Sequence, residues 1–368
     1  MKKNIILLIF FALSSNLLQA QEWVELIPWE CSTPQEDPAM LQPGPVYVYD
    51  PDGPVKTMRV NLYFLLRTDG TGNFTETSDN YTNRPYNGYL YAEDIIKKCN
   101  NRWNINFELR HMPDPPVPAL PKKVQLQLCG VFFHRNTKDY DLYVDEFPPL
   151  SFVENSGEVI NIFITKKSGG GAATGIGSTH ERIRIGTAYS YYIMSVDSNN
   201  TWYISPNLYN HELGHILGLP HTIQNCCTDT ACYNCDDGIS DTPDFWQLIK
   251  MGYLPCAWNH ILGSNNMMDY NADNHALSPM QISRMHACID GAKLYYRNCK
   301  YKTRSLDITH FTTNKAYIAK QVNIPLGRSI VVANNSALFI NAEEFTIDGE
   351  FEVRYGSIFN VDIVPSCD

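Results

Sequence analysis

The stretch HELGHILGLPH, residues 211 to 221, constrains this chain more than any other, because it holds three of the 10 histidines at fixed offsets. Residues four apart lie one turn apart on an α-helix, so His211 and His215 face the same way and supply two ligands of a tetrahedral zinc site. Gly218 allows a left-handed exit from the helix, which brings His221 round as the third ligand. Three neutral imidazoles leave the fourth position open to water.

Glu212 directly follows the first ligand and is the predicted general base. Its carboxylate can reach a water at the open position and take a proton from it, while zinc lowers the pKa of that water. Such a site hydrolyses an acyl bond without a covalent intermediate. The alternative, core histidines on an ordinary helix, leaves the spacing to His221 unexplained. The pair Ser205 and Pro206 predicts where this helix begins.

Apolar patterns on the N-terminal side of the motif predict an α/β sheet domain. In residues 58 to 66 every second side chain is apolar, which predicts a half-buried strand. Residues 92 to 103 carry apolar side chains at helical spacing, which predicts an amphipathic helix. Residues 124 to 128 alternate again, and residues 159 to 165 form an apolar run of strand length. We therefore expect a sheet with at least one packed helix before the active-site helix.

Two further segments predict how a substrate would bind. The glycine-rich residues 168 to 177 predict no regular structure, and the stretch that follows them predicts an edge strand near residues 183 to 190. An extended peptide can bind to an edge strand through its backbone, as an added strand. Protein or peptide substrates are therefore expected.

The two ends of the chain differ from the middle. Lys2, Lys3 and an apolar run before Ala20 are typical of a signal peptide, residues 1 to 20, and the proline-rich residues 21 to 55 indicate a leader. Residues 56 to 302 are expected to form the catalytic domain. Residues 303 to 368 contain short strand-like pieces typical of a small all-β domain, either a sandwich or a short solenoid.

The signal peptide predicts a mature protein that is secreted, periplasmic or on the cell surface. No later apolar run is long enough for a transmembrane helix. The net charge of −10 argues against nucleic acid or an anionic membrane surface as a partner, because both attract basic proteins.

The motif at 211 to 221 resembles the signature of the metzincin zinc metallopeptidases. That resemblance implies a methionine turn beneath the zinc, and NNMMDY at 265 to 270 supplies one, with Met268 as the turn methionine and Met267 as the competing assignment. Tyr270 resembles the tyrosine that several metzincins place near zinc, where its hydroxyl can stabilise the oxyanion. A ring packed under the site is the alternative role.

Within the metzincins, the chain is similar to the pappalysin family. The motifs that carry this similarity are Thr222, DDGISDTP at 236 to 243, NMMDY, and LSPMQISRM at 277 to 285. The resemblance covers residues 55 to 300 and implies a zinc endopeptidase fold, often with calcium near a segment joined by disulfides. Four aspartates are candidate calcium ligands, with a solvated acidic loop as the alternative: Asp229, Asp236, Asp237 and Asp241.

Export favours disulfides for the 11 cysteines, rather than a second zinc site at CYNC, residues 232 to 235. Ten of them lie at or beyond Cys99 and could form five pairs, which leaves Cys31 in the leader. The context ECSTP is similar to short leader motifs of pappalysin relatives. Cys31 is thus a candidate latency ligand that would occupy the open zinc position, and a disulfide with a later cysteine is the alternative.

These observations predict a secreted zinc endopeptidase that cleaves proteins. An alternative from a different class is a binding or adhesion protein whose peptidase domain only presents the C-terminal β domain, but every motif position is intact. Another metzincin family, such as the matrixins, is the second alternative, and the DTP and MDY stretches argue against it.

Overall fold

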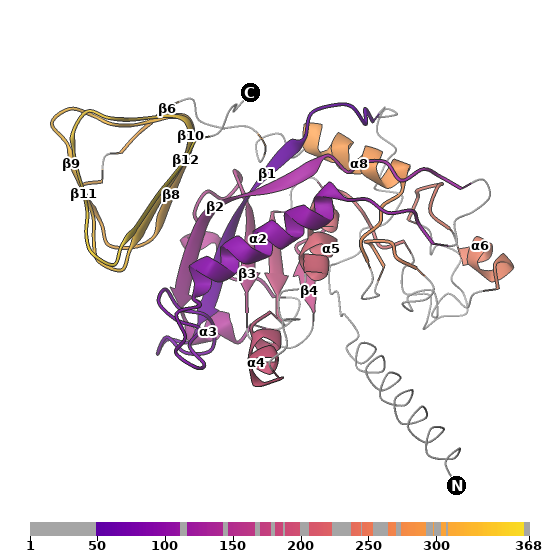
Figure 1. Cartoon of the computed structure of the whole chain (residues 1–368), viewed down its shortest axis with the longest axis horizontal. Coiled ribbons are helices and arrows are strands. Elements are labelled where there is room, and N and C mark those ends of the chain that lie inside the picture. Colours follow the sequence, from indigo (N-terminus) through magenta and orange to yellow (C-terminus); the bar gives the residue numbers. More distant parts are fainter. Residues whose placement is uncertain are drawn as a thin grey trace, which may run out of the picture.

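A computed structural model describes a sheet domain and a set of C-terminal β-coils (Figure 1). The described residues are 49–110, 116–142, 146–165, 170–177, 181–186, 188–198, 206–222, 237–243, 245–252, 264–269, 274–291, 297, 303–306 and 308–363. The expected signal peptide, the expected leader up to residue 48 with Cys31, and Tyr270 lie outside them. Within the described residues, no helix combines the length and apolar character needed to cross a bilayer.

The first domain is built on a five-stranded sheet in the order β2-β1-β3-β5-β4. Four strands are parallel, and only β4 runs antiparallel to its neighbour β5. The strands are β1 (Lys56–Leu66), β2 (Val124–Arg135), β3 (Ile160–Ile164), β4 (Gly171–Ala173) and β5 (Arg182–Ile185). The mixed α/β fold class predicted from the sequence is confirmed.

β1 lies inside this sheet and corrects the prediction of a half-buried strand. Its residues are buried on both faces apart from a partly buried Thr57. A parallel strand that is covered on both faces buries the side chains of both faces. Apolar and polar residues therefore do not alternate along it. The predicted helix is α2 (Gly88–Asn104), whose Ile95, Ile96 and Trp103 pack into the core.

α2 also protects the outer edge of β2. The side chain of Asn100 accepts from the backbone nitrogen of Leu126 at 2.7 Å and donates to its carbonyl at 2.9 Å. An unpaired strand edge is a template for unwanted pairing with other chains. The Asn100 carboxamide therefore replaces a neighbouring strand at this point.

The other edge of the sheet is β4, not the segment predicted from the sequence. β5 pairs on both sides, with β3 and with β4, so the predicted edge strand near residues 183 to 190 is wrong. Residues 188 to 198 form helix α4 (Ala188–Ser198). The glycine-rich stretch, predicted to be irregular, supplies the true edge, because Gly171 and Ala173 pair with Ile185 and Ile183 through their backbones.

The remaining elements surround this sheet. α5 (Pro206–Ile216) lies against α2 and β4, and α8 (Pro279–Asp290) begins with a capping box formed by Ser278 and Gln281. The shorter elements are α3 (Thr137–Tyr140), η2 (Leu150–Phe152) and α6 (Phe245–Lys250).

The C-terminal strands form a short solenoid, one of the two architectures expected from the sequence. All its strand pairs are parallel and give sheets in the order β12-β10-β8-β6 and β11-β9-β7. The paired residues Ser329 and Glu350 are 21 residues apart, and Lys315 and Leu338 are 23 apart, so the coils differ slightly in length. The coils outline a triangle (Figure 1). The strands are β6 (Thr303–Ser305), β7 (His310–Phe311), β8 (Lys315–Ile324), β9 (Ser329–Val332), β10 (Ala337–Ile347), β11 (Glu350–Val353) and β12 (Ile358–Ile363).

The solenoid packs on β2, at the end of the sheet away from β4 (Figure 1). Ala316 on β8 belongs to the core of the first domain and lies against Gly130, where an added Cβ would come within 3.1 Å of the Ala316 Cβ. Arg304 donates to both carboxylate oxygens of the buried Glu158 at 3.0 Å. The two units therefore share a packed interface.

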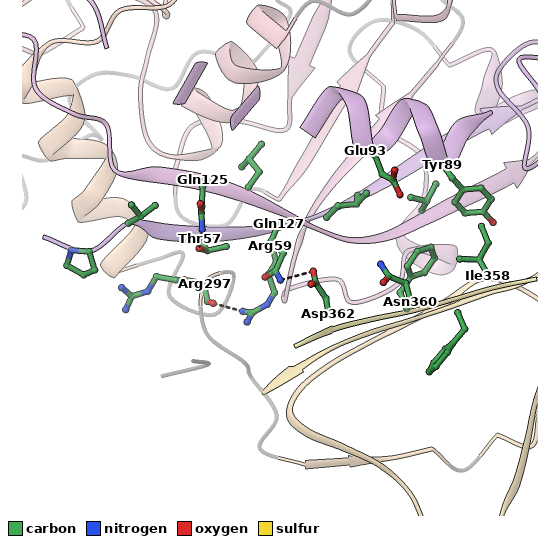
Figure 2. A pocket seen from close by; sticks show the side chains of 17 residues that line it. Thr57, Arg59, Tyr89, Glu93, Gln125, Gln127, Arg297, Ile358, Asn360 and Asp362 are labelled. Carbon is green, nitrogen blue, oxygen red and sulfur yellow. Dashed lines mark hydrogen bonds between the residues drawn. The ribbon is translucent and has the colours of Figure 1, made fainter. Parts of the chain in front are cut away.

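A cavity of about 870 Å³ remains within this interface (Figure 2). β1, β2 and α2 line one side, and β10 and β12 line the other. Gln127 donates to Asp362 at 3.1 Å across the cavity, and Arg59 donates to the Arg297 carbonyl (Figure 2).

Candidate active site

The motif folds as its spacing predicts. α5 carries His211 and His215 one turn apart, and both are almost fully buried. Gly218 follows the helix with φ +92°, the left-handed conformation expected there, and the Leu219 nitrogen donates to the Gly214 carbonyl at 2.9 Å. This exit brings His221 back to the two helical histidines.

The three imidazoles converge through the same ring atom. The Nε2 atoms of His211, His215 and His221 lie 3.1 to 3.2 Å apart. The Nδ1 atom of His211 is 2.7 Å from the Met267 carbonyl, and that of His215 is 2.7 Å from the Leu219 carbonyl. Carbonyls accept only, so Nδ1 carries the proton of both rings and their Nε2 lone pairs face inward.

This donor set fits zinc. Nitrogens bound tetrahedrally at 2.0 to 2.1 Å lie about 3.3 Å from one another, close to the separation seen here. Burial lowers the pKa of His211 to about 4 and the pKa values of His215 and His221 well below their usual range, so all three are neutral ligands. In the described part of the chain, these histidines are the only metal-ligating group of this kind.

Glu212 lies beside the edge strand. Its side chain is fully buried, and a Cβ added to Gly171 on β4 would come within 2.5 Å of Glu212 Oε1. The backbone of β4 thus runs directly along the carboxylate. Sequence analysis did not identify Gly171 as part of the site, although the glycine-rich stretch was a signal of close backbone approach.

The two candidate methionines of the turn have different positions. Met268 is fully buried, and its sulfur lies 2.4 Å from where a Cβ of Gly214 would be, beneath the active-site helix. Met267 uses its backbone instead, since its carbonyl accepts from His211. Asn266 supports the turn by accepting from the Met268 nitrogen at 2.9 Å.

Two of the four candidate calcium ligands are described, and both serve local structure. Asp237 accepts from the Ile239 nitrogen and the Thr242 hydroxyl. Asp241 accepts from the Ser278 hydroxyl at 2.5 Å and the Met280 nitrogen at 2.8 Å, at the start of α8. Asp229 and Asp236 lie outside the described residues.

The predicted pairing of ten cysteines is wrong. Cys99 and Cys129 are free thiols. Cys99 lies on the buried face of α2 and packs in the core, and Cys129 packs with Val159 and Ile318 where the solenoid meets β2. Both act as small apolar side chains, and burial raises the pKa of the Cys129 thiol to about 12.

A histidine triad, an adjacent glutamate and a methionine turn under the helix, at one end of a mixed sheet, define a metzincin-type zinc metallopeptidase. Residues 155–290 match the peptidase family model described as pregnancy-associated plasma protein-A. Through this region the chain is similar to the pappalysin family.

Two further comparisons were made. Mature mirolysin of Tannerella forsythia, solved in complex with a cleaved peptide, matches with 14% sequence identity and a TM-score of 0.42, over 67% of this chain and 96% of that one. Comparison with curated proteins gave no match.

Proposed function

We propose that this chain is a secreted zinc-dependent endopeptidase that hydrolyses peptide bonds within proteins. The observation that carries the proposal is the convergence of three Nε2 atoms on one point, with the buried Glu212 directly after the first of these histidines on α5 and along the edge strand β4. One small site thus combines ligands for zinc, a base and a strand edge able to bind an extended peptide.

His211, His215 and His221 would hold the zinc ion. When bound, zinc lowers the pKa of a water molecule and polarises a carbonyl. Glu212 takes the proton of the attacking water and returns it to the departing amine. The carbonyls of Met267 and Leu219 fix two imidazole rings, so that their Nε2 atoms stay directed at one point.

The substrate is proposed to lie along β4 as an added strand. This position replaces the one predicted near residues 183 to 190, since β5 is covered by β4. β4 is three residues long and its backbone passes Glu212 at Gly171. Backbone pairing of this kind binds a peptide without requiring a particular side chain.

Tyr270 is proposed to stabilise the oxyanion. It directly follows the described turn that contains Met268, which supports a position close to the triad. A Tyr270→Phe variant should lose turnover and keep the stability of the parent protein. Unchanged turnover would remove the role.

Secretion and latency are proposed from the N-terminal sequence alone. Residues 1 to 20 are expected to direct export, and Cys31 to occupy the open zinc position until the leader is cut. A Cys31→Ala precursor should be active without processing, or process itself faster. A precursor that stays inert until cut would show that Cys31 is no switch.

The central test is digestion of a proteome-derived peptide library by the zinc-loaded chain, read by mass spectrometry. A Glu212→Gln variant should retain zinc and lose roughly 10²- to 10⁴-fold in turnover, the usual worth of a general base. Internal cleavage by the parent chain alone supports the proposal. Equal cleavage by both chains would refute the mechanism, and tight zinc binding without cleavage would favour the binding-module alternative.

A further inference from the structure

Lys122 is a buried cation that the proposed reaction does not use. Its side chain is fully buried just before β2, and its ammonium donates to the carbonyls of Arg102, Ile105 and His275 at 2.9, 2.6 and 2.8 Å. Burial lowers the pKa of Lys122 to about 7, and the nearby charge of Arg102 lowers it further in the same direction. In the described part of the chain, its hydrogen-bond partners are all backbone carbonyls.

Two of these carbonyls belong to the end of α2, where the last carbonyls of a helix need partners. The third belongs to His275, in the segment that returns from the methionine turn. Lys122 therefore joins the end of α2 to that segment. The Lys122 carbonyl also accepts from His286 Nε2 at 2.8 Å, which adds a contact to α8.

A short hydrogen-bonded path leads from His275 to a zinc ligand. The peptide unit after His275 donates from the Ala276 nitrogen to the Asn265 carbonyl at 2.9 Å, and the Ala276 carbonyl accepts from the Met267 nitrogen at 2.7 Å. The Met267 carbonyl then accepts from His211 Nδ1 at 2.7 Å. Each hydrogen bond in this path involves a backbone group, so a displacement of one peptide unit shifts the next.

Neighbouring contacts support the same connection. Asn106 donates to the Leu277 carbonyl and accepts from its nitrogen, at 2.9 and 3.0 Å. Asn265 accepts from the Arg110 nitrogen at 2.9 Å and donates to the Glu108 carbonyl at 2.9 Å. The segment that follows α2, residues 105–110, and the methionine turn are thus joined by hydrogen bonds, with Lys122 at the buried end of this contact.

We propose that Lys122 is a positioning residue for the metal site, which sets the Met267 carbonyl and through it the orientation of His211. This inference rests on the proposed zinc chemistry. Partners that orient metal ligands from outside the coordination sphere usually change metal affinity 10- to 100-fold when removed. The position of Lys122, 89 residues before His211 and outside the matched family region, hides this role in the sequence.

The test measures zinc affinity of the full mature chain by competition with a chromogenic chelator, together with the visible spectrum of the cobalt-substituted protein. Lys122→Met keeps the length of the side chain and removes its donors, and it should weaken zinc binding at least 10-fold and alter the cobalt spectrum. Lys56→Met is the matched control, because Lys56 is also nearly buried but pairs with Asp290 at 2.6 Å. Its zinc affinity should equal that of the parent.

Equal zinc affinity in the Lys122→Met and parent chains would overturn the inference, as would an equal loss in Lys56→Met. If Lys122→Met does not fold, hydrogen–deuterium exchange of the parent chain decides. Zinc loading should then slow exchange in peptides covering residues 100–106 and 120–124, and protection that ends at the methionine turn would refute the connection. A parent chain that binds no zinc would overturn both this inference and the proposed function.

Discussion

Positions 171 and 214 leave no room for a side chain, because other side chains of the site fill the space beside Gly171 and Gly214. Glu212 occupies the position next to Gly171, and Met268 occupies the position next to Gly214. A Cβ at either glycine would lie closer than 3 Å to one of these side chains. The geometry of the proposed base therefore depends on a residue without a side chain.

A Gly171→Val variant should lose activity and keep zinc. The new Cβ would lie 2.5 Å from Glu212 Oε1 and 2.8 Å from its Cγ, so the carboxylate or β4 must move. A displacement of about 1 Å can reduce turnover about 10²-fold. Zinc content and peptide turnover, measured on the same sample, check this, and normal turnover would show that β4 does not constrain the base.

The zinc ligands could be predicted from the sequence because they are close together in it and follow helix geometry. The roles of Gly171 and Lys122 could not be predicted in this way. Each depends on contacts with segments that are distant in the sequence and that only the fold brings close. The same limit explains the cysteines. The expected export predicts disulfides, but only packing shows that Cys99 lies in the core.

At the scale of elements, the exit from α5 determines where the third ligand lies. Gly218 has φ +92°, and a Cβ there would lie 3.3 Å from the Cβ of Cys288 on α8. A Gly218→Ala variant should lose about 1–2 kcal/mol of unfolding free energy, the usual cost of the left-handed conformation for a residue with a side chain. It should also bind zinc more weakly, since His221 follows three residues later.

Gly252 provides the control for this variant, because it has φ +83° and, among the described residues, no atom lies within 4 Å of an added Cβ. Gly252→Ala should cost similar stability in denaturant unfolding and leave zinc affinity unchanged. Equal zinc affinity in both variants would show that the exit conformation does not place His221.

The strand order at the edge of the sheet was harder to predict than the positions of single elements, for a physical reason. α2 and α5 have local periodicity and end signals, so their positions follow from the sequence. β4 is three small residues whose pairing depends wholly on β5, and β5 looks like an edge strand until β4 covers it. Strand order is a property of segments far apart, and periodicity does not encode it.

At the scale of the whole molecule, zinc should stabilise the fold. Its ligands come from α5 and the segment after it, and His211 is held by the methionine turn. A ligand that binds only the native state at 1,000 times its Kd adds about 4 kcal/mol. Chelation should therefore lower the Tm and added zinc should restore it, in the parent and in Glu212→Gln alike. A Tm that chelation does not change would contradict the site.

The solenoid and the sheet domain should unfold together. Ala316 is buried against Gly130, so Ala316→Glu would place a charge in the interface and separate the two units. The expected result is two unfolding transitions by calorimetry in place of one. Tyr355→Glu changes a side chain that is 95% exposed and should leave a single transition. One transition in both variants would show that the interface does not couple the units.

The solenoid could be predicted only as an all-β unit, with a sandwich as the alternative. The inside of its coils is filled by Ala, Val, Ile, Leu and Phe side chains, types that the strands of a sandwich bury as well. The interface with β2 could not be predicted, because it depends on the shape of two finished surfaces.

The short edge strand has a consequence for how targets would be selected. A peptide that pairs with three residues of β4 must have its own backbone groups unbonded, which a folded target rarely offers. Before cleavage, the target must therefore open locally, and the cleavage rate is proportional to the equilibrium constant for that opening. Such a protease ranks its targets by their local instability more than by their sequence, and loosely folded loops of otherwise stable proteins would be cut first.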